Sequence, residues 1–207
     1  ISTLLNDIAE KASLQNISEI IMVDGGSTDA TFDLAFQFSE KLPLVILKSD
    51  KGRAKQMNLG AGNATGEILY FLHADTVLPY HFDSQIISEI LKGNLAGCFR
   101  MKFDSQHPIL KMSQWFTRFN FKSCRGGDQT LFITSELFRK LKGFNEAYTV
   151  YEDCEFINRI YDQFHFTIIK DYVTTSARRY QNNGTIKLQF HFFVIHLKKL
   201  KQILIIN

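Results

Sequence analysis

Short apolar runs alternate along the chain with longer segments whose apolar residues recur every three or four positions. The short runs predict strands at 19–24, 44–47, 67–72, 96–103, 130–134 and 166–169. The longer segments predict helices at 2–13, 29–41, 52–63, 79–91, 107–121, 136–141, 152–164 and 185–204. Because strands and helices alternate, we expect an α/β fold: a single doubly wound, mostly parallel sheet flanked by helices.

The pattern changes near residue 185. Residues 1–184 are expected to form one α/β domain, since 207 residues with a hydrophobic content of 45% suffice for one large core. Residues 185–207 are expected to form an amphipathic helical tail that mixes aromatic and basic residues. Such a tail suits a membrane surface, and it equally suits packing on the sheet or on a second copy of the chain in a homodimer.

Charge and cysteine content narrow the class of protein. The net charge of +3 is too small to indicate nucleic-acid binding. The three cysteines (Cys98, Cys124 and Cys154) are odd in number and lack CxxC spacing, so neither a disulfide framework nor a thiolate metal cluster is expected. The sequence shows no signal peptide and no full transmembrane segment. We therefore expect a cytoplasmic protein, with the tail as its point of contact with the inner face of a membrane.

Two of the predicted strands end on a carboxylate. The run 67–72 is followed by His73-Ala74-Asp75-Thr76, and the run 19–24 ends on Asp24. Ligands of open α/β sheets bind beyond the carboxyl ends of the strands. The two acids therefore predict a site for a charged ligand, held through a metal ion.

The turn after the first of these strands is rich in glycine. Gly25 and Gly26 permit a tight turn and close approach to a ligand, and Ser27 and Asp29 are typical of a helix start. Free N–H groups at that helix start would suit a nucleotide. An ordinary capped turn explains the same residues, and the absence of GxGxxG weakens a dinucleotide interpretation.

Two basic motifs suit phosphate groups. The stretch 51–58 reads Lys-Gly-Arg-Ala-Lys-Gln-Met-Asn and places Arg53 at a predicted helix start. Arg178 and Arg179 could clamp a diphosphate. The plainer interpretation of both motifs is a solvated basic surface.

Two further motifs suit catalysis. Glu152, Asp153 and Glu155 crowd the start of a helix, where one of them could act as a general base or all three could simply favour the helix dipole. The loop 125–129, Arg-Gly-Gly-Asp-Gln, could close over a substrate or form an ordinary turn.

The order of these motifs is more specific than any one of them. In sequence they are VDGGSTD at 23–29, GRAKQMN at 52–58, FLHADT at 71–76, GDQ at 127–129 and ED at 152–153. This series, which covers nearly the whole chain, closely resembles the family 2 glycosyltransferases of GT-A fold. The FLHADT, GRAxQMN and SARRY spellings resemble one bacterial subfamily, whose members are associated with radical-SAM or selenium-related proteins.

The resemblance implies an inverting transfer of a sugar from a nucleotide-diphosphate sugar to a hydroxyl acceptor. Asp153 matches the catalytic base with Glu152 beside it, Asp75 matches the metal-binding acid for Mn²⁺ or Mg²⁺, and Asp128 and Gln129 fall where the family contacts acceptor or donor sugar. The implied nucleotide and donor residues are Asp24, Gly25, Ser27, Asp29, Arg53, Gln56, Asn58, His73, Arg178 and Arg179.

The chain departs from the family pattern in two places. His73 stands where the family often has the first acid of its DxD motif, so metal affinity is expected to rest on Asp75. The strand with which the family begins, ending in a Pro-x-x-Asn-Glu-like loop, does not precede Ile1. We therefore expect a central strand to be missing from the sheet.

Two other functions stay open. A non-catalytic nucleotide-sugar-binding module would tolerate His73 and a missing strand, but it would have no need of both Asp75 and Glu152-Asp153. A nucleotidyltransferase would share a nucleotide and a metal, but it would ordinarily carry an N-terminal phosphate-binding loop. For a sugar transferase, an acceptor attached to a lipid would suit the aromatic and basic tail.

Overall fold

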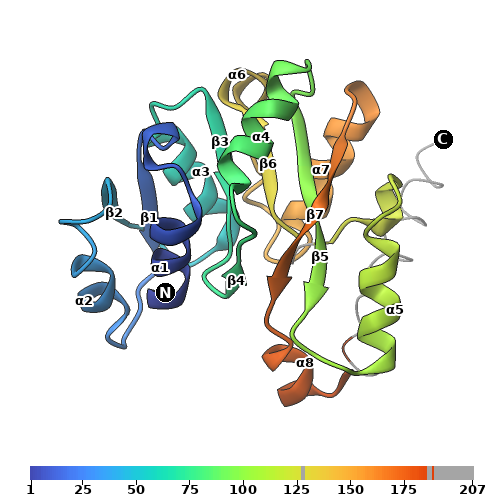
Figure 1. Cartoon of the computed structure of the whole chain (residues 1–207), viewed down its shortest axis with the longest axis horizontal. Coiled ribbons are helices and arrows are strands. Elements are labelled where there is room, and N and C mark those ends of the chain that lie inside the picture. Colours follow the sequence, from blue (N-terminus) through green and yellow to red (C-terminus); the bar gives the residue numbers. More distant parts are fainter. Residues whose placement is uncertain (127–128, 186–187, 189–207) are drawn as a thin grey trace.

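The computed structural model describes residues 1–126, 129–185 and 188. Its strands are β1 (Ile20–Asp24), β2 (Leu44–Lys48), β3 (Ile68–Phe71), β4 (Thr76–Val77), β5 (Ala96–Phe103), β6 (Leu131–Thr134) and β7 (Thr167–Thr175). Its α-helices are α1 (Ser2–Lys11), α2 (Thr31–Phe36), α3 (Arg53–Asn63), α4 (Phe82–Leu91), α5 (Pro108–Phe116), α6 (Ser135–Lys140), α7 (Glu152–Gln163) and α8 (Arg178–Asn183). Two short 3₁₀ helices are η1 (Leu14–Asn16) and η2 (Lys122–Cys124). The helices flank the strands as the α/β pattern predicts (Figure 1).

The α/β class is confirmed, but the strands of the described chain form two sheets rather than one. β1 and β2 make a parallel pair, and the larger sheet has the order β3-β6-β5-β7-β4. Within that larger sheet β5 and β7 are parallel, whereas the other neighbours are antiparallel. The larger sheet is therefore mixed in direction, parallel along its longest pairing, β5 with β7, and antiparallel elsewhere. A helix between two strands permits a parallel crossover without requiring one, so the alternation alone could not fix the directions.

The division of the sheet falls between β1 and β3. Glu19, just before β1, accepts backbone N–H bonds from Thr65 and Gly66, just before β3, at 2.5 and 3.3 Å. These bonds lower the pKa of the Glu19 carboxyl. In the described chain β1 is hydrogen-bonded to β2 and β3 to β6, so no strand bridges the two.

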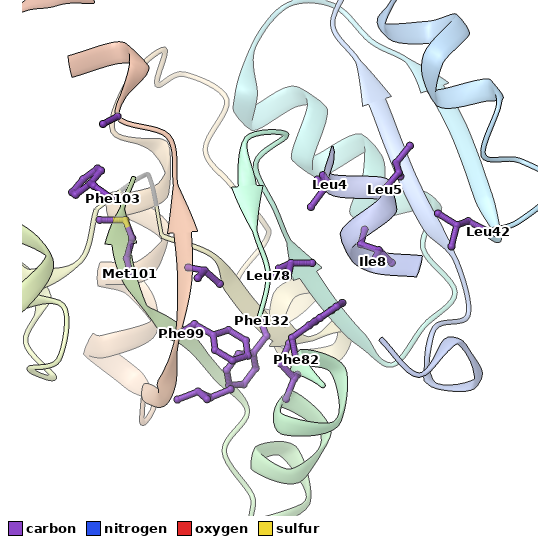
Figure 2. Packing of buried hydrophobic residues seen from close by; sticks show 14 of the residues in the cluster. Leu4, Leu5, Ile8, Leu42, Leu78, Phe82, Phe99, Met101, Phe103 and Phe132 are labelled. Carbon is purple, nitrogen blue, oxygen red and sulfur yellow. The ribbon is translucent and has the colours of Figure 1, made fainter. Parts of the chain in front are cut away.

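Two apolar clusters cover opposite faces of the larger sheet. One joins α1 and α4 to β5 and β6 and includes the fully buried rings of Phe99 and Phe132 (Figure 2). The other joins α3, α6 and α7 to β5 and β6 around Phe156 and Ile160. Helix α7 thus has a well-packed face on the sheet, which fixes the position of its first turn.

Several elements end elsewhere than the sequence predicts. Helix α2 covers residues 31–36 instead of 29–41, and α5 covers 108–116 instead of 107–121. Helix α5 stops because the Thr117 hydroxyl donates to the Gln114 carbonyl at 2.7 Å and accepts the Met101 N–H at 3.1 Å. Strand β7 is longer than predicted because it pairs along most of β5.

The predicted tail, 185–207, lies almost entirely outside the described residues. So does Asp128, together with Gly127. Among the described residues, no helix is both long and apolar enough to cross a bilayer.

Candidate active site

The first turn of α7 buries two neighbouring carboxylates. The residues Glu152 and Asp153 are 1% and 9% exposed. Negative charge is favourable at a helix N-terminus, which explains the sequence locally, but full burial of Glu152 goes beyond what helix capping requires. Tyr151, just before the helix, adopts a φ of +85°, which a bulky residue rarely does. The burial and this backbone strain mark the head of α7 as a candidate site.

Arg53 lies against both carboxylates. Its Nη2 donates to Asp153 Oδ2 at 2.7 Å, and its Nη1 lies 3.2 Å from Glu152 Oε1. The second contact is an ion pair without hydrogen-bond geometry, and within the described chain both Glu152 oxygens lack a hydrogen-bond partner. Gly52 has a φ of +143°, which suits glycine, and it places Arg53 as the first residue of α3. One partly exposed cation is therefore shared by two buried acids.

His73 completes this cluster from the end of β3. Its Nε2 lies 3.2 Å from Arg53 Nη2, an arrangement in which the ring nitrogen accepts, because a guanidinium can only donate. A small pocket opens beside His73 and Asp153, with Gln129 on its wall. Its other lining residues are apolar: Met57, Phe71, Leu72, Leu131, Phe144 and Ile157. The pocket, with a volume of about 20 Å³, therefore combines apolar walls with a few converging polar groups.

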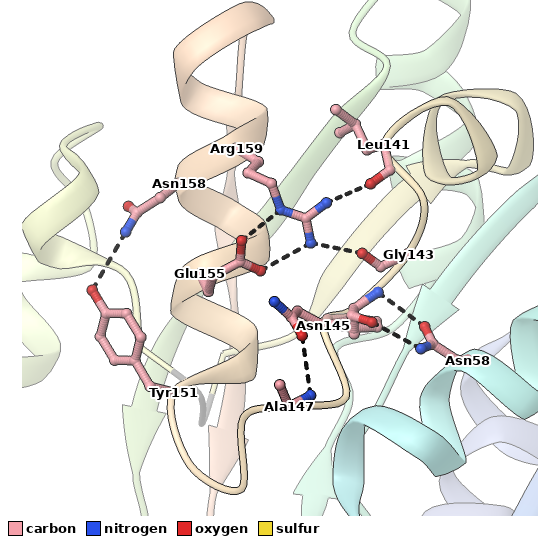
Figure 3. Close-up of polar contacts among 10 residues, drawn as sticks. Asn58, Leu141, Gly143, Asn145, Ala147, Tyr151, Glu155, Asn158 and Arg159 are labelled. Atoms are coloured by element: carbon pink, nitrogen blue, oxygen red, sulfur yellow. Dashed lines mark hydrogen bonds and ion pairs between the residues drawn. The ribbon is translucent and has the colours of Figure 1, made fainter. Parts of the chain in front are cut away.

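A polar network holds the loop that leads into α7. The Asn58 amide donates to the Phe144 carbonyl at 2.9 Å and accepts the Phe144 N–H at 2.9 Å. Arg159 of α7 donates to the carbonyls of Leu141 and Gly143 and pairs with Glu155, as Figure 3 shows. Both the oxygen and the nitrogen of the Asn58 side-chain amide bond this loop. The role of Asn58 in donor binding stays a prediction. The network fixes the approach to Tyr151 and so to the two buried acids.

The turn after β1 is closed by bonds between Asp24 and Ser27, whereas α2 begins later than predicted, with Ala30 as its N-cap and no side-chain cap. The Asp24 carboxylate accepts the Ser27 hydroxyl at 2.6 Å and the Ser27 N–H at 3.0 Å. These bonds, the hydroxyl first, lower the pKa of Asp24. Asp29 likewise bonds Thr31, which lowers the pKa of Asp29. Asp24 is therefore held ionised and oriented at the end of its strand.

Gln56 connects this turn to the cluster. Its Nε2 donates to the Val23 carbonyl at 3.1 Å, next to Asp24 and Gly25. Gln56 lies one turn after Arg53 on α3. Helix α3 thus provides Arg53 to the cluster of buried acids and Gln56 to the turn after β1.

Asp75 differs in its surroundings from the cluster of Arg53, His73, Glu152 and Asp153. It is exposed, in the turn between β3 and β4. In the described part of the chain, no three His, Cys, Asp or Glu side chains gather closely enough to hold a metal by themselves. A single exposed carboxylate still fits Mg²⁺ or Mn²⁺, since such ions take one or two carboxylates and complete their coordination with substrate phosphates and water.

Gln129 and the arginine pair differ in their surroundings. Gln129 is buried, and its Oε1 accepts from Arg125 Nη1 at 2.9 Å while its Nε2 donates to the Cys124 carbonyl at 3.1 Å. Arg178 and Arg179 are exposed at the start of α8, beyond the end of β7 (Figure 1). The structure thus brings Arg53, His73, Glu152 and Asp153 into contact, with Gln129 in the same pocket.

Sequence reasoning overlooked two arginines that shape the site. Arg125 is 3% exposed and donates to the carbonyls of Thr117 and Phe119 as well as to Gln129. Arg159 clamps the loop before α7. The signal for Arg159 was its position four residues after Glu155 on one helix, whereas nothing in the sequence distinguished Arg125 from a surface cation.

Comparisons with known proteins identify relatives of the chain. Residues 3–162 match the family described as Glycosyl transferase family 2. A protein of Nostoc sp. named as an uncharacterized glycosyltransferase is 34% identical over 82 residues, covering 38% of this chain and 26% of that protein. A PGL/p-HBAD biosynthesis glycosyltransferase of Mycobacterium bovis is 46% identical over 63 residues, covering 29% of this chain and 25% of that protein.

Solved structures share the fold. The crystal structure of S. aureus TarS 1-349 in complex with UDP has a TM-score of 0.71 at 19% identity and covers 86% of this chain and 57% of that one. The mannosyltransferase PcManGT of Pyrobaculum calidifontis, in complex with GDP-Man and Mn²⁺, has a TM-score of 0.58 at 20% identity. The match covers 82% of this chain and 53% of that one.

The chain matches about a quarter of the length of the curated relatives and little more than half of these solved chains. The family match nevertheless runs from α1 through almost all of α7 and includes Arg53, His73, Glu152 and Asp153. The chain belongs to glycosyl transferase family 2.

Proposed function

We propose that this chain carries the catalytic domain of an inverting glycosyltransferase, formed by residues 1–184, which moves a sugar from a nucleotide-diphosphate sugar to a hydroxyl acceptor. The observation that carries the proposal is the contact of Arg53 with the buried carboxylates of Glu152 and Asp153 beside a small pocket. A binding surface has no need to bury two acids, whereas a general base must be held and desolvated. From the motif spellings, we further propose that the chain belongs to the FLHADT, GRAxQMN and SARRY subfamily.

The donor is proposed to lie along the ends of β1 and β3. Asp24, oriented by Ser27, is suited to accept hydrogen bonds from the ribose or base of the nucleotide. The solved relatives hold UDP or GDP-Man, so a nucleoside diphosphate is the chemistry to expect. Its phosphates would contact Arg53 and the N-terminus of α3. Arg178 and Arg179 are proposed to add charge from α8.

A divalent metal, Mn²⁺ or Mg²⁺, is proposed to bind Asp75 together with the donor phosphates. When bound, such an ion would neutralise charge on the departing diphosphate. PcManGT was solved with Mn²⁺, which supports this choice of metal. Since Asp75 is the family's final metal-binding acid and His73 replaces the first, the affinity for metal without the donor is expected to be low.

The protein side chains supply positioning and proton transfer. Arg53 has two competing partners: the acids in the structure described here, and the phosphates of a bound donor. A diphosphate that draws Arg53 away would remove this ion pair from Asp153, which would then take the proton of the acceptor hydroxyl. That hydroxyl would then attack the anomeric carbon from the face opposite the leaving diphosphate, which inverts the centre. Gln129 on the pocket wall, and Asp128 outside the described residues, would contact the sugars.

One specific observation favours the alternative of a non-catalytic nucleotide-sugar-binding module. His73 takes the place of a metal-binding acid, and the described chain has no ready cluster of metal ligands. Such a module would bind donor without breaking it. Release of nucleoside diphosphate from the donor therefore separates the two functions.

The test combines binding and turnover. UDP-GlcNAc and GDP-mannose, with and without Mn²⁺, should raise the melting temperature if they bind the native state. The proposal expects Mn²⁺-dependent release of nucleoside diphosphate from one such donor, and loss of that release in Asp75→Asn. Because Asp75 is exposed, the variant should melt like the parent chain without ligand. Binding with no release under any metal would support the binding module instead.

The acceptor is proposed to be a hydroxyl group, and a lipid-linked one suits the aromatic and basic C-terminal residues. The predicted membrane contact or homodimer through 185–207 rests on residues outside the described ones, so it stays a prediction.

A further inference from the structure

A cluster of aromatic rings lies on the outer side of α5 and the segment after it. The aromatic cluster consists of Trp115, Phe116, Phe119 and Phe121. Neighbouring ring centroids are 4.8 to 6.4 Å apart, so the four rings form one continuous patch. Phe121 is 64% exposed, and Trp115 and Phe116 are 45% and 43% exposed. Contiguous apolar surface of this kind marks an interaction site more often than scattered single residues do.

Helix α5 bonds the sheet through polar groups and exposes aromatic rings, the reverse of an ordinary amphipathic surface helix. Its inner face is anchored to β5 by polar groups: Gln114 Oε1 accepts the Phe103 N–H at 3.1 Å, and the Thr117 hydroxyl accepts the Met101 N–H. Leu110 is buried on the same side, whereas Met112 joins the aromatic residues outside with 57% exposure. Packing on the sheet therefore does not account for the rings.

Within the segment that carries the aromatic cluster, the charged residues have one sign. Residues 105–126 contain no Asp or Glu but include Lys111, Arg118, Lys122 and Arg125. Arg118 lies over the Trp115 ring at 5.2 Å. Lys122 pairs with Asp162 of α7, and Arg125 is buried, so Lys111 and Arg118 are the cations beside the rings. A combination of Trp, Phe and basic residues is typical of surfaces that lie in the headgroup region of a bilayer.

The cluster is tied to the predicted acceptor side of the site. Buried Arg125 donates to the carbonyls of Thr117 and Phe119 and also to Gln129, which lines the pocket beside Asp153. Tyr161 of α7 donates to Asn120 at 2.5 Å. The segment that carries the rings is thus braced against the helix that carries the two acids.

We propose that the aromatic cluster, with Lys111 and Arg118, docks on an anionic lipid surface. The rings enter the headgroup region while the two cations face lipid phosphates. The contacts through Arg125 and Tyr161 then hold the pocket in a fixed relation to that surface. This role rests on α5 and residues 117–121, and it is independent of the predicted C-terminal tail.

Trp115 is the single tryptophan of the chain, so its fluorescence reports on the cluster alone. Vesicles of phosphatidylcholine with phosphatidylglycerol should shift its emission to the blue, and brominated lipid should quench it. Vesicles of phosphatidylcholine alone should do so much more weakly. An emission that ignores anionic vesicles overturns the proposal. A blue-shifted emission without lipid also overturns the proposal. If it grows with protein concentration, a second copy covers the rings. If it is constant, the chain's own C-terminal residues cover them.

Two paired variants test the rings and the charges. Phe116→Ser with Phe121→Ser keeps the tryptophan and should weaken binding to anionic vesicles about tenfold or more, from the apolar area lost. Lys111→Gln with Arg118→Gln should weaken it about fivefold per charge, with little change on neutral vesicles. Phe32→Ser with Phe36→Ser changes an exposed stacked pair on α2, which has Lys48 over the Phe32 ring but Asp29 and Asp33 nearby in sequence; it is the matched control and should bind like the parent chain. Equal loss in the control would overturn the proposal.

The membrane role and the transferase role can fail separately. The ring and charge variants lie outside the pocket, so donor-induced melting shifts and release of nucleoside diphosphate in solution should equal those of the parent chain. A chain that binds vesicles but never turns over a donor would refute the proposed function and leave the membrane surface standing.

Discussion

Helices α5 and α7 depart from the ordinary amphipathic pattern in opposite directions. Helix α7 buries charge: Glu152 and Asp153 lie at its head, 1% and 9% exposed. Helix α5 exposes rings: Trp115 and Phe116 face solvent while Gln114 and Thr117 bond β5. Burying a carboxylate and exposing an aromatic ring both oppose folding.

The difference indicates what kind of partner each helix meets. A buried acid is useful where a proton must move in a dry pocket, and an exposed ring is useful where the partner is itself apolar. The segment after α5 is linked to α7, since Lys122 pairs with Asp162 and Tyr161 bonds Asn120. Chemistry and docking can therefore occupy neighbouring elements without sharing residues.

The largest expected effect is on the chemistry at α7. Asp153→Asn should lower kcat by about a thousandfold, because a general base contributes roughly 10² to 10⁴. Steady-state release of nucleoside diphosphate with saturating donor and acceptor measures it. If Glu152→Gln is inactive and Asp153→Asn is active, the base is Glu152 instead.

The next effect contrasts the two faces of α5. Leu110→Ala should lower the free energy of unfolding by about 2 to 4 kcal/mol, because Leu110 is 1% exposed and its loss leaves a cavity. Trp115→Ser on the outer face should cost less, about 1 kcal/mol, from the ring contacts with Phe116 and Phe119. Urea unfolding at one protein concentration compares them. A large cost for Trp115→Ser would mean that the rings are packed in the fold rather than available to a partner.

A smaller effect is expected for the cation of the α7 cluster. Arg53→Gln should destabilise the fold by about 1 to 2 kcal/mol, less than for a fully buried pair because the Arg53 side chain is 42% exposed. Lys55→Gln, on the same helix and paired loosely with Asp50, is the control and should cost almost nothing. Adding Glu152→Gln to Arg53→Gln should recover part of the loss. No recovery would show that Glu152 is not the uncompensated charge.

Much of the fold followed from the sequence because the relevant signals are local. The apolar alternation predicted β5 at 96–103 as observed, and the strand ends carrying Asp24 and His73 were anticipated. Strand directions were not, because pairing depends on contacts distant in sequence. Helix α5 ended early for the same reason, since Thr117 bonds Met101 of β5.

The site was predicted in part. The order of motifs singled out Arg53, Glu152 and Asp153, but no local pattern predicts that one arginine contacts both acids. The acidic start of α7 could equally have been a solvated helix cap. Only burial, which is a property of the assembled fold, distinguishes the two interpretations.

The competition for Arg53 is the central claim, and donor affinity tests it most directly. Calorimetric titration with the donor and Mn²⁺ should compare the parent chain, Asp153→Asn and Arg53→Gln. We expect Asp153→Asn to bind donor at least as tightly as the parent chain, because Arg53 loses a competing carboxylate. Arg53→Gln should bind about tenfold more weakly, from the loss of a charge-assisted phosphate contact. Equal affinity in all three proteins would contradict the account, because Arg53 would then not contact the donor.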